Sequence, residues 1–201
     1  MLLIKQQPKI KWLFISLSFI VIMAGGIFGL KESNLIFTKK VGEKIDSFNG
    51  VNVYFNGEVG NIEGRNLTSD NYNLGLKYQC VEFVKRYYYK HLNHKMPNSY
   101  GHAKDFFNPN IKDGQMNTER NLVQFTNLST KKPKVDDLLV FSATSWNPYG
   151  HVAIISKVND SEIEIVQQNV GNHSRKNLTL RVENGKWKID NLQILGWLRK
   201  L

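Results

Sequence analysis

The chain has 201 residues, of which 41% are hydrophobic and 22% are charged, and its formal net charge is +10. This composition is ordinary for a globular protein, so it excludes a disordered or collagen-like chain, and the length suits one domain with a short additional segment. The sequence contains no internal repeat and no low-complexity segment.

The N-terminal segment is the most apolar part of the chain. Residues 12–30 carry no charged side chain, and lysines at positions 5, 9 and 11 precede them. This is about the length that a helix needs to cross a bilayer, and basic flanks stay in the cytoplasm. We therefore predict a signal anchor and stalk in residues 1–38, with a transmembrane helix over residues 12–30, and a membrane-anchored domain, residues 39–201, outside the cytoplasm.

Two other interpretations of this segment stay open. The small residues Ala24, Gly25 and Gly26 are typical of a signal-peptidase site, and cleavage there would make the rest of the chain a secreted protein. A buried core helix is the second alternative.

In an exported domain, the basic charge suits an anionic partner such as a cell wall or lipid headgroups, or it serves solubility alone. Export argues against nucleic acid as a partner.

Short extended segments and loops are predicted before the first helix. Residues 31–50 are polar, which is typical of a stalk and loop, whereas residues 51–55 alternate before Asn56-Gly57 and predict a strand and turn. Residues 61–75 are rich in Asn, Gly and Ser and predict a loop.

The clearest helix covers residues 80–92. Its apolar side chains recur at spacings of three and four, which places them on one face, and charged side chains occupy the other face. The only cysteine of the chain, Cys80, opens this helix. A shorter helix is predicted over residues 103–107, and a weaker one over residues 118–125.

After Pro133 the pattern changes to short segments with the composition of strands. These segments are residues 135–141, 151–158, 162–166, 178–182, 187–189 and 193–198. Polar turns join the second segment to the third and the fourth to the fifth, which predicts two hairpins. Helices therefore precede a mostly antiparallel sheet, and this order predicts an α+β domain.

Cys80 has no partner for an internal disulfide. It is therefore a buried residue, an intermolecular bridge or a thiol kept for chemistry. The start of a helix is the positive end of its dipole, and such a position can lower the pKa of a thiol from about 8.5 toward 7 or below. The sequence thus predicts Cys80 as a candidate nucleophile that requires a base.

Among the five histidines, we prefer His151 as this base. His91 and His94 lie several turns along the helix that Cys80 opens, too far away to touch its sulfur, and we expect both on the surface. His102 and His151 both follow glycine, but only His151 opens a strong apolar strand that would hold its ring in place.

The strand that returns after His151 ends in Gln167-Gln168-Asn169. Alternation along a strand puts Gln167 and Asn169 on one face, so either amide can orient the imidazole. A cysteine, then a histidine on a strand, then an amide on the next strand is the order found in papain-like folds. A buried cysteine with a structural histidine is the alternative that these residues leave open.

Three segments resemble a known family. YQCVEFVKRYY, YGHVAIISKV and EIVQQNV are similar to the CHAP domain, a cysteine- and histidine-dependent amidohydrolase/peptidase, and most of residues 50–199 resembles the amidase domain of bifunctional glutathionylspermidine synthetase/amidase. The resemblance implies a papain-like (NlpC/P60-like) α+β fold and amide hydrolysis through an acyl-enzyme. It implies Cys80 as nucleophile, His151 as general base and Gln167 or Asn169 as the orienting group, with the backbone N–H of Cys80 holding the oxyanion. No motif requires a metal or cofactor.

The resemblance implies two substrate classes. Peptidoglycan peptides suit an anchored domain outside the cytoplasm, and a peptide–polyamine conjugate suits the likeness to the glutathionylspermidine amidase. A third interpretation is a binding module with impaired turnover, because Gln167 stands where the family often has glutamate and supplies no charge to the histidine. Lys85 stands where the amidase pattern favours arginine, and lysine lacks the bidentate fork for a carboxylate.

Overall fold

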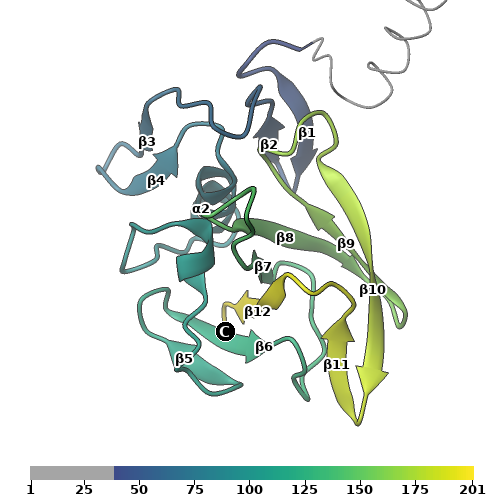
Figure 1. Ribbon diagram of the computed structural model, residues 1–201. Coiled ribbons are helices and arrows are strands. Elements are labelled where there is room, and N and C mark those ends of the chain that lie inside the picture. Colours follow the sequence, from purple (N-terminus) through teal and green to yellow (C-terminus); the bar gives the residue numbers. More distant parts are fainter. Residues whose placement is uncertain (1–38) are drawn as a thin grey trace, which may run out of the picture. The chain divides into compact units, whose positions relative to one another are not determined.

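The computed structural model describes residues 39–201 (Figure 1). The predicted signal anchor, its transmembrane helix over residues 12–30 and the stalk fall outside the described residues, so they stay predictions. Within residues 39–201, no helix is long and apolar enough to span a bilayer. This part of the chain is mostly sheet with one α-helix, which confirms the α+β class but not the several helices that the sequence predicts.

An eight-stranded antiparallel sheet forms the body of the domain. Five consecutive strands form a meander at one side, and the last strand of the described residues inserts between residues 138–141 and residues 122–126. In spatial order the strands are β11 (Lys186–Ile189), β10 (Arg175–Glu183), β9 (Glu162–Val166), β8 (His151–Val158), β7 (Leu138–Phe141), β12 (Ile194–Arg199), β6 (Leu122–Thr126) and β5 (Gln115–Asn117).

The large sheet is apolar on both faces, and strand β8 shows how this arises. Because side chains alternate along a strand, Val152 and Ile154 pack into one core cluster, while Ala153 and Ile155 pack into a second. All four side chains are fully buried. The start of β8 is therefore fixed from both sides, and this is the end that carries His151.

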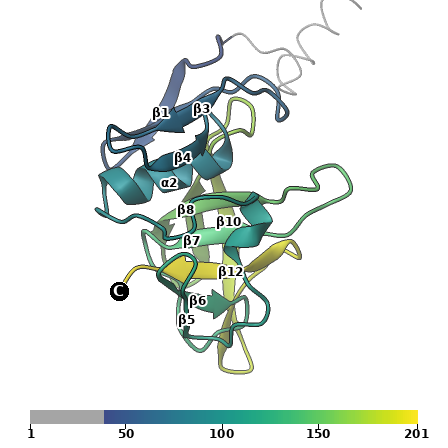
Figure 2. The same cartoon turned by 90° about the vertical axis from the view of Figure 1, so that its left-hand side faces the viewer.

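The α-helix, α2 (Cys80–Lys90), packs against β8 in the first of these clusters, and both views show the two elements side by side (Figures 1 and 2). Its apolar stripe, Phe83, Val84, Tyr87 and Tyr88, is buried completely. At about 25 cal/mol per Å² of apolar surface, each of these side chains contributes roughly 1.5–3 kcal/mol to folding. This packing holds the first residue of the helix, Cys80, beside the sheet.

Two small sheets and one 3-10 helix complete the described residues. The small sheets pair β1 (Lys44–Phe48) with β2 (Val51–Tyr54) and β3 (Arg65–Leu67) with β4 (Asn73–Leu76). The 3-10 helix, η1, spans Ala103–Phe106.

Several predicted elements agree with these boundaries. The first helix, both hairpins and the final strand occur where their patterns place them, and the strand within residues 51–55 is β2. The short helix predicted over residues 103–107 is the 3-10 helix η1.

Three predictions about secondary structure are wrong. Residues 118–125 are a turn and most of strand β6 rather than a helix. The predicted loop over residues 61–75 contains β3 and most of β4, and the predicted stalk and loop over residues 31–50 contains β1. In β4, Gly75 has φ of +123°, and a Cβ there would lie 3.3 Å from the Glu82 backbone. Gly75, which in the sequence favours the prediction of a loop, therefore allows this strand to approach α2 closely.

Candidate active site

A cavity of about 680 Å³ opens at the N-terminal end of α2, and both Cys80 and His151 line it. Cys80 comes from the first turn of the helix and His151 from the first position of β8. These residues lie far apart in the sequence, and the packing of α2 on β8 brings them to one cavity. Asn169 also lines this cavity, whereas Gln167 lies outside the lining.

The Cys80 thiol is buried, with 7% of the residue exposed. Burial raises the pKa of this thiol to about 11, against the opposing effect of backbone N–H groups from Val152, Val81 and Cys80 itself. The prediction of a lowered thiol pKa is therefore wrong for the substrate-free domain. The helix start does direct N–H groups at the sulfur, but the loss of water around a thiolate outweighs them.

The His151 side chain forms a hydrogen bond with Gln167. Burial lowers the pKa of its imidazole to about 4, while a hydrogen bond with Gln167 raises it and the charge of Lys176 lowers it. His151 Nε2 lies 3.0 Å from Gln167 Oε1. Because a carbonyl oxygen only accepts, Nε2 carries the proton, and the unprotonated Nδ1 is free to act as a base.

Gly150 fixes the position of this histidine. Its φ is +74°, and a Cβ at this position would lie 2.7 Å from the carbonyl oxygen of Phe141 and 2.9 Å from Cβ of Lys104. Only glycine accepts both the left-handed conformation and the close approach. Gly150 thus allows the backbone beside His151 to lie close to Phe141 and Lys104.

Asn169 does not share the position of Gln167, although the predicted alternation puts both on one face. Strand β9 ends at Val166, and Asn169 has φ of +68°, so the alternation does not continue to it. The Asn169 side chain accepts from Asn56 Nδ2 at 2.8 Å and donates to Val59 O and to Gln79 Oε1. In the part of the chain that the structure describes, Gln167 is therefore the amide that contacts His151. The Asn169 side chain instead forms hydrogen bonds with the loop at Val59 and with Gln79, the residue that precedes α2.

Lys85 and His94 also differ from expectation. Lys85 is 1% exposed and donates to the carbonyl oxygens of Asn73 and Ser99, so its ammonium group does not reach the cavity. His94 is buried rather than on the surface, and its Nε2 lies 2.9 Å from the carbonyl oxygen of Arg120. Both side chains have a structural role in this fold.

Three other residues of the cavity have no sequence motif. Arg65 in β3, Tyr100 and Tyr149 line it, and Arg65 lies over the Tyr100 ring, 5.7 Å from its centroid. The His102 ring packs against Tyr149 at the same cavity, with centroids 4.8 Å apart. The sequence pattern puts these residues in loops. Aromatic residues in a loop are the one feature there that indicates a binding surface.

We expect alkylation of Cys80 by iodoacetamide to rise with pH through the neutral range, without a plateau near about pH 6. The reason is that burial raises the thiol pKa and lowers the imidazole pKa, so both groups are neutral before substrate binds. In the described residues no hydrogen bond joins Cys80 to His151. The measurement is the alkylation rate against pH in the full chain and in His151→Ala, with His102→Ala as the matched control. A plateau near pH 6 that disappears only in His151→Ala would show a thiolate–imidazolium pair instead.

Replacing Gln167 with glutamate should raise the pKa of His151, because a carboxylate accepts the Nε2 proton and stabilises the imidazolium cation. Gln167→Leu accepts no hydrogen bond and should move the pKa in the opposite direction. NMR titration of the imidazole in the three proteins measures both shifts. Identical titration curves in all three would mean that Gln167 does not orient this histidine.

Residues 70–169 match the family model described as CHAP domain. Trypanothione synthetase of Crithidia fasciculata is 29% identical over 149 residues, which cover 68% of this chain and 23% of that protein. Bifunctional glutathionylspermidine synthetase/amidase of Escherichia coli (strain K12) is 30% identical over 148 residues, which cover 67% of this chain and 23% of that protein. The chain thus spans less than a quarter of the length of these curated relatives.

A solved structure titled "The crystal structure of Ly7917" aligns with a TM-score of 0.25 and 25% identity. The alignment covers 36% of this chain and 30% of that chain.

Proposed function

The chain belongs to the CHAP domain family, and we propose that it hydrolyses an amide bond with Cys80 as nucleophile and His151 as general base. The observation that carries this proposal is that both side chains line one cavity at the start of α2. The hydrogen bond from His151 Nε2 to Gln167 supports it further, because the other ring nitrogen is then unprotonated. The proposed reaction class rests on the family, and the proposed roles of Cys80 and His151 rest on their place in the lining of the cavity.

In this mechanism, substrate binding precedes formation of the thiolate. His151 takes the proton of the Cys80 thiol as the sulfur attacks the carbonyl carbon, and the imidazolium then protonates the departing amine. Water hydrolyses the thioester with His151 again as base. The backbone N–H of Cys80, in the first turn of α2, has no acceptor within the helix and can hold the oxyanion. The Gln79 side chain is not available for this, because its amide donates to Val59 O and Asn61 O.

The charge of the cavity bears on the substrate. No Asp or Glu is among the described residues that line it, and Arg65 is the one Lys or Arg among them. A polyamine carries several positive charges and would meet no carboxylate here, whereas a substrate carboxylate would meet Arg65. We therefore favour a peptide with a free carboxylate, such as a peptidoglycan peptide, over a peptide–polyamine conjugate. The predicted anchor in residues 1–38 would hold the domain near such a substrate.

The test compares two substrates with the full chain. One is a muropeptide, and the other is glutathionylspermidine, the substrate class that a relative's name suggests. Release of a new amine is followed by mass spectrometry, and we expect a higher kcat/KM for the muropeptide. Cleavage of the polyamine conjugate alone would favour the second substrate class. No cleavage of either, together with retained binding, would favour the binding-module interpretation.

Arg65→Ala should raise KM for a substrate with a free carboxylate by about tenfold, which is the loss of one charge-assisted hydrogen bond, and change kcat little. The Arg65 guanidinium is held by Asn73 Oδ1 at 3.0 Å, so it is positioned before substrate binds. The matched control is the same substrate with its carboxylate amidated, for which the variant and the natural chain should have equal KM. An equal rise in KM for both substrates would assign Arg65 a structural role.

A further inference from the structure

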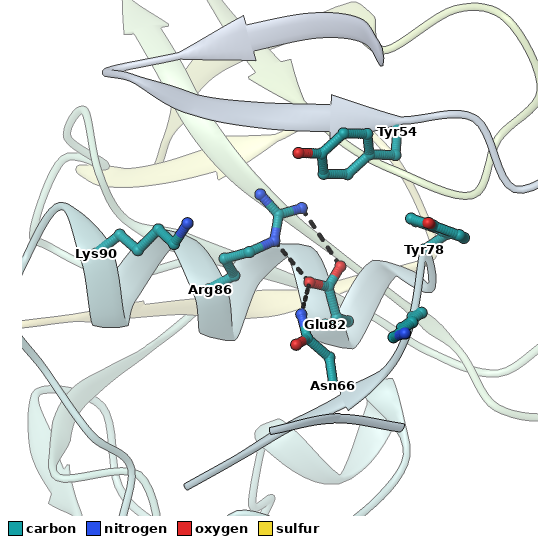
Figure 3. A pocket seen from close by; sticks show the side chains of 7 residues that line it. Tyr54, Asn66, Tyr78, Glu82, Arg86 and Lys90 are labelled. Atoms are coloured by element: carbon teal, nitrogen blue, oxygen red, sulfur yellow. Dashed lines mark hydrogen bonds and ion pairs between the residues drawn. The ribbon is translucent and has the colours of Figure 1, made fainter. Parts of the chain in front are cut away.

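A second cavity, of about 300 Å³, lies along a different stripe of α2 and shares no lining residue with the first. Glu82, Arg86 and Lys90 are spaced by four residues, so they lie on one face of the helix. The other lining residues come from β2, β3 and the segment before α2. They are Tyr54, Asn66, Lys77 and Tyr78. Figure 3 shows the Arg86 guanidinium between the carboxylate of Glu82 and the ring of Tyr54.

The acidic group of this cavity is already fully engaged. Glu82 is 2% exposed and accepts hydrogen bonds from Arg86 Nε at 2.6 Å and Nη2 at 3.3 Å. It also accepts from Asn66 Nδ2 at 2.8 Å and from Gln168 Nε2 at 3.0 Å. A carboxylate with four donors has little capacity for another. Glu82 therefore compensates the charge of Arg86 and leaves the other cations of the cavity uncompensated.

The uncompensated cations are the two lysines at the rim. Lys77 and Lys90 are both exposed, and neither forms an ion pair within the part of the chain that the structure describes. Lys90 stands at the end of α2 and Lys77 precedes its start, so the two ammonium groups come from opposite ends of the helix. An anion inside the cavity would be attracted from two directions.

Aromatic side chains form one wall of the cavity. The rings of Tyr54 and Tyr78 meet edge to face with centroids 5.6 Å apart, and the Arg86 guanidinium lies 5.0 Å from the Tyr54 centroid. Tyr78 has φ of +65°, an uncommon conformation for a bulky residue, which the surrounding structure must hold in place. The wall thus offers hydroxyl groups to an anion and apolar surface to the group that carries it.

We propose that this cavity binds a phosphate group, as a monoester or a diester. Lysine ammonium groups bind phosphate as point charges, and both rim lysines would attract a phosphate placed in the cavity between them. The excess of two positive charges matches a phosphate better than a single carboxylate. Such a ligand binds on the helix that carries Cys80 but outside the proposed catalytic cavity, so this inference does not depend on the proposed reaction.

The test is isothermal titration calorimetry of the full chain at low ionic strength, where exposed charges are least screened. The probes are inorganic phosphate, glycerol phosphate and glycerophosphoglycerol, a soluble phosphodiester headgroup. The double variant Lys77→Ala/Lys90→Ala removes both rim charges. The matched control Lys112→Ala/Lys186→Ala removes two exposed lysines remote from the cavity lining and has the same net charge.

We expect saturable binding of at least one probe, weakened about tenfold or more by the double variant and unchanged in the control. Preference for the monoesters would identify a free phosphate ligand, and preference for the diester would identify a lipid headgroup or a phosphodiester polymer. The proposal is overturned if no probe binds saturably, or if the double variant binds as the control does. Because the rim lysines are exposed, thermal unfolding should give the same Tm for both double variants.

Discussion

Cys80→Ala is expected to lower kcat/KM for amide hydrolysis by about 10⁴-fold or more, since a nucleophile acts with its base as a unit and its loss removes the acyl-enzyme route. Cys80 is the only cysteine in the chain, so no other thiol can replace it. The variant removes one buried sulfur atom from a helix start and keeps the surrounding packing. Initial rates with the muropeptide, for the natural chain and the variant, measure the loss.

His151→Ala should show a comparable loss, and His102→Ala is the matched control because His102 lines the same cavity without a bond to Gln167. We expect the control to retain most of the activity. If Cys80→Ala keeps more than a tenth of the natural rate, the nucleophile lies elsewhere and the proposed mechanism is wrong.

Arg86→Ala is expected to lower the free energy of unfolding by about 3–5 kcal/mol, the usual cost of leaving one partner of a buried ion pair unpaired. Glu82 and Arg86 have side chains exposed by 2% and 6%. Arg86 Nη1 also donates to the carbonyl oxygen of Asn52 at 2.7 Å, so the variant removes a hydrogen bond between α2 and β2 as well. Urea unfolding of the full chain, followed by tryptophan fluorescence, measures the change.

The double variant Glu82→Gln/Arg86→Met separates charge from packing. It removes both ions together and should be less destabilised than Arg86→Ala, because no unpaired charge remains buried. Equal destabilisation in the two proteins would assign the cost to the hydrogen bonds that both lose, such as that from Arg86 to the Asn52 carbonyl oxygen, rather than to the unpaired buried charge of Glu82.

The parts of the fold that sequence predicts are those governed by local pattern. The hairpin of β8 and β9 combines period-two alternation with a polar turn, and both signals lie within a few residues of each other. Strand β6 shows the opposite case. Leu122, Val123 and Phe125 are buried, and Gln124 between them is buried as well, so the segment has no exposed face and no period. Such a segment cannot be told from a helix without knowledge of its neighbours.

The candidate site divides in the same way. The types and order of Cys80, His151 and Gln167 are properties of the sequence, and the cavity brings the first two together. The thiol pKa is not such a property, since it depends on burial by strand β8 and other parts of the fold. The place of Arg65 in the site could not be predicted, because β3 is short and polar. The contact of Arg65 with Tyr100 joins residues that are far apart in the sequence.

The place of β12 in the sheet has a consequence for folding. This strand, near the C-terminal end of the sequence, hydrogen-bonds to β7 on one side and to β6 on the other. The β5–β6 hairpin therefore joins the rest of the sheet only through residues 194–199. During synthesis, the meander of β7 to β11 can form first, while the surfaces that β12 will cover stay exposed. We infer that folding is completed late and from the C-terminal side, with a slow step set by long-range strand pairing.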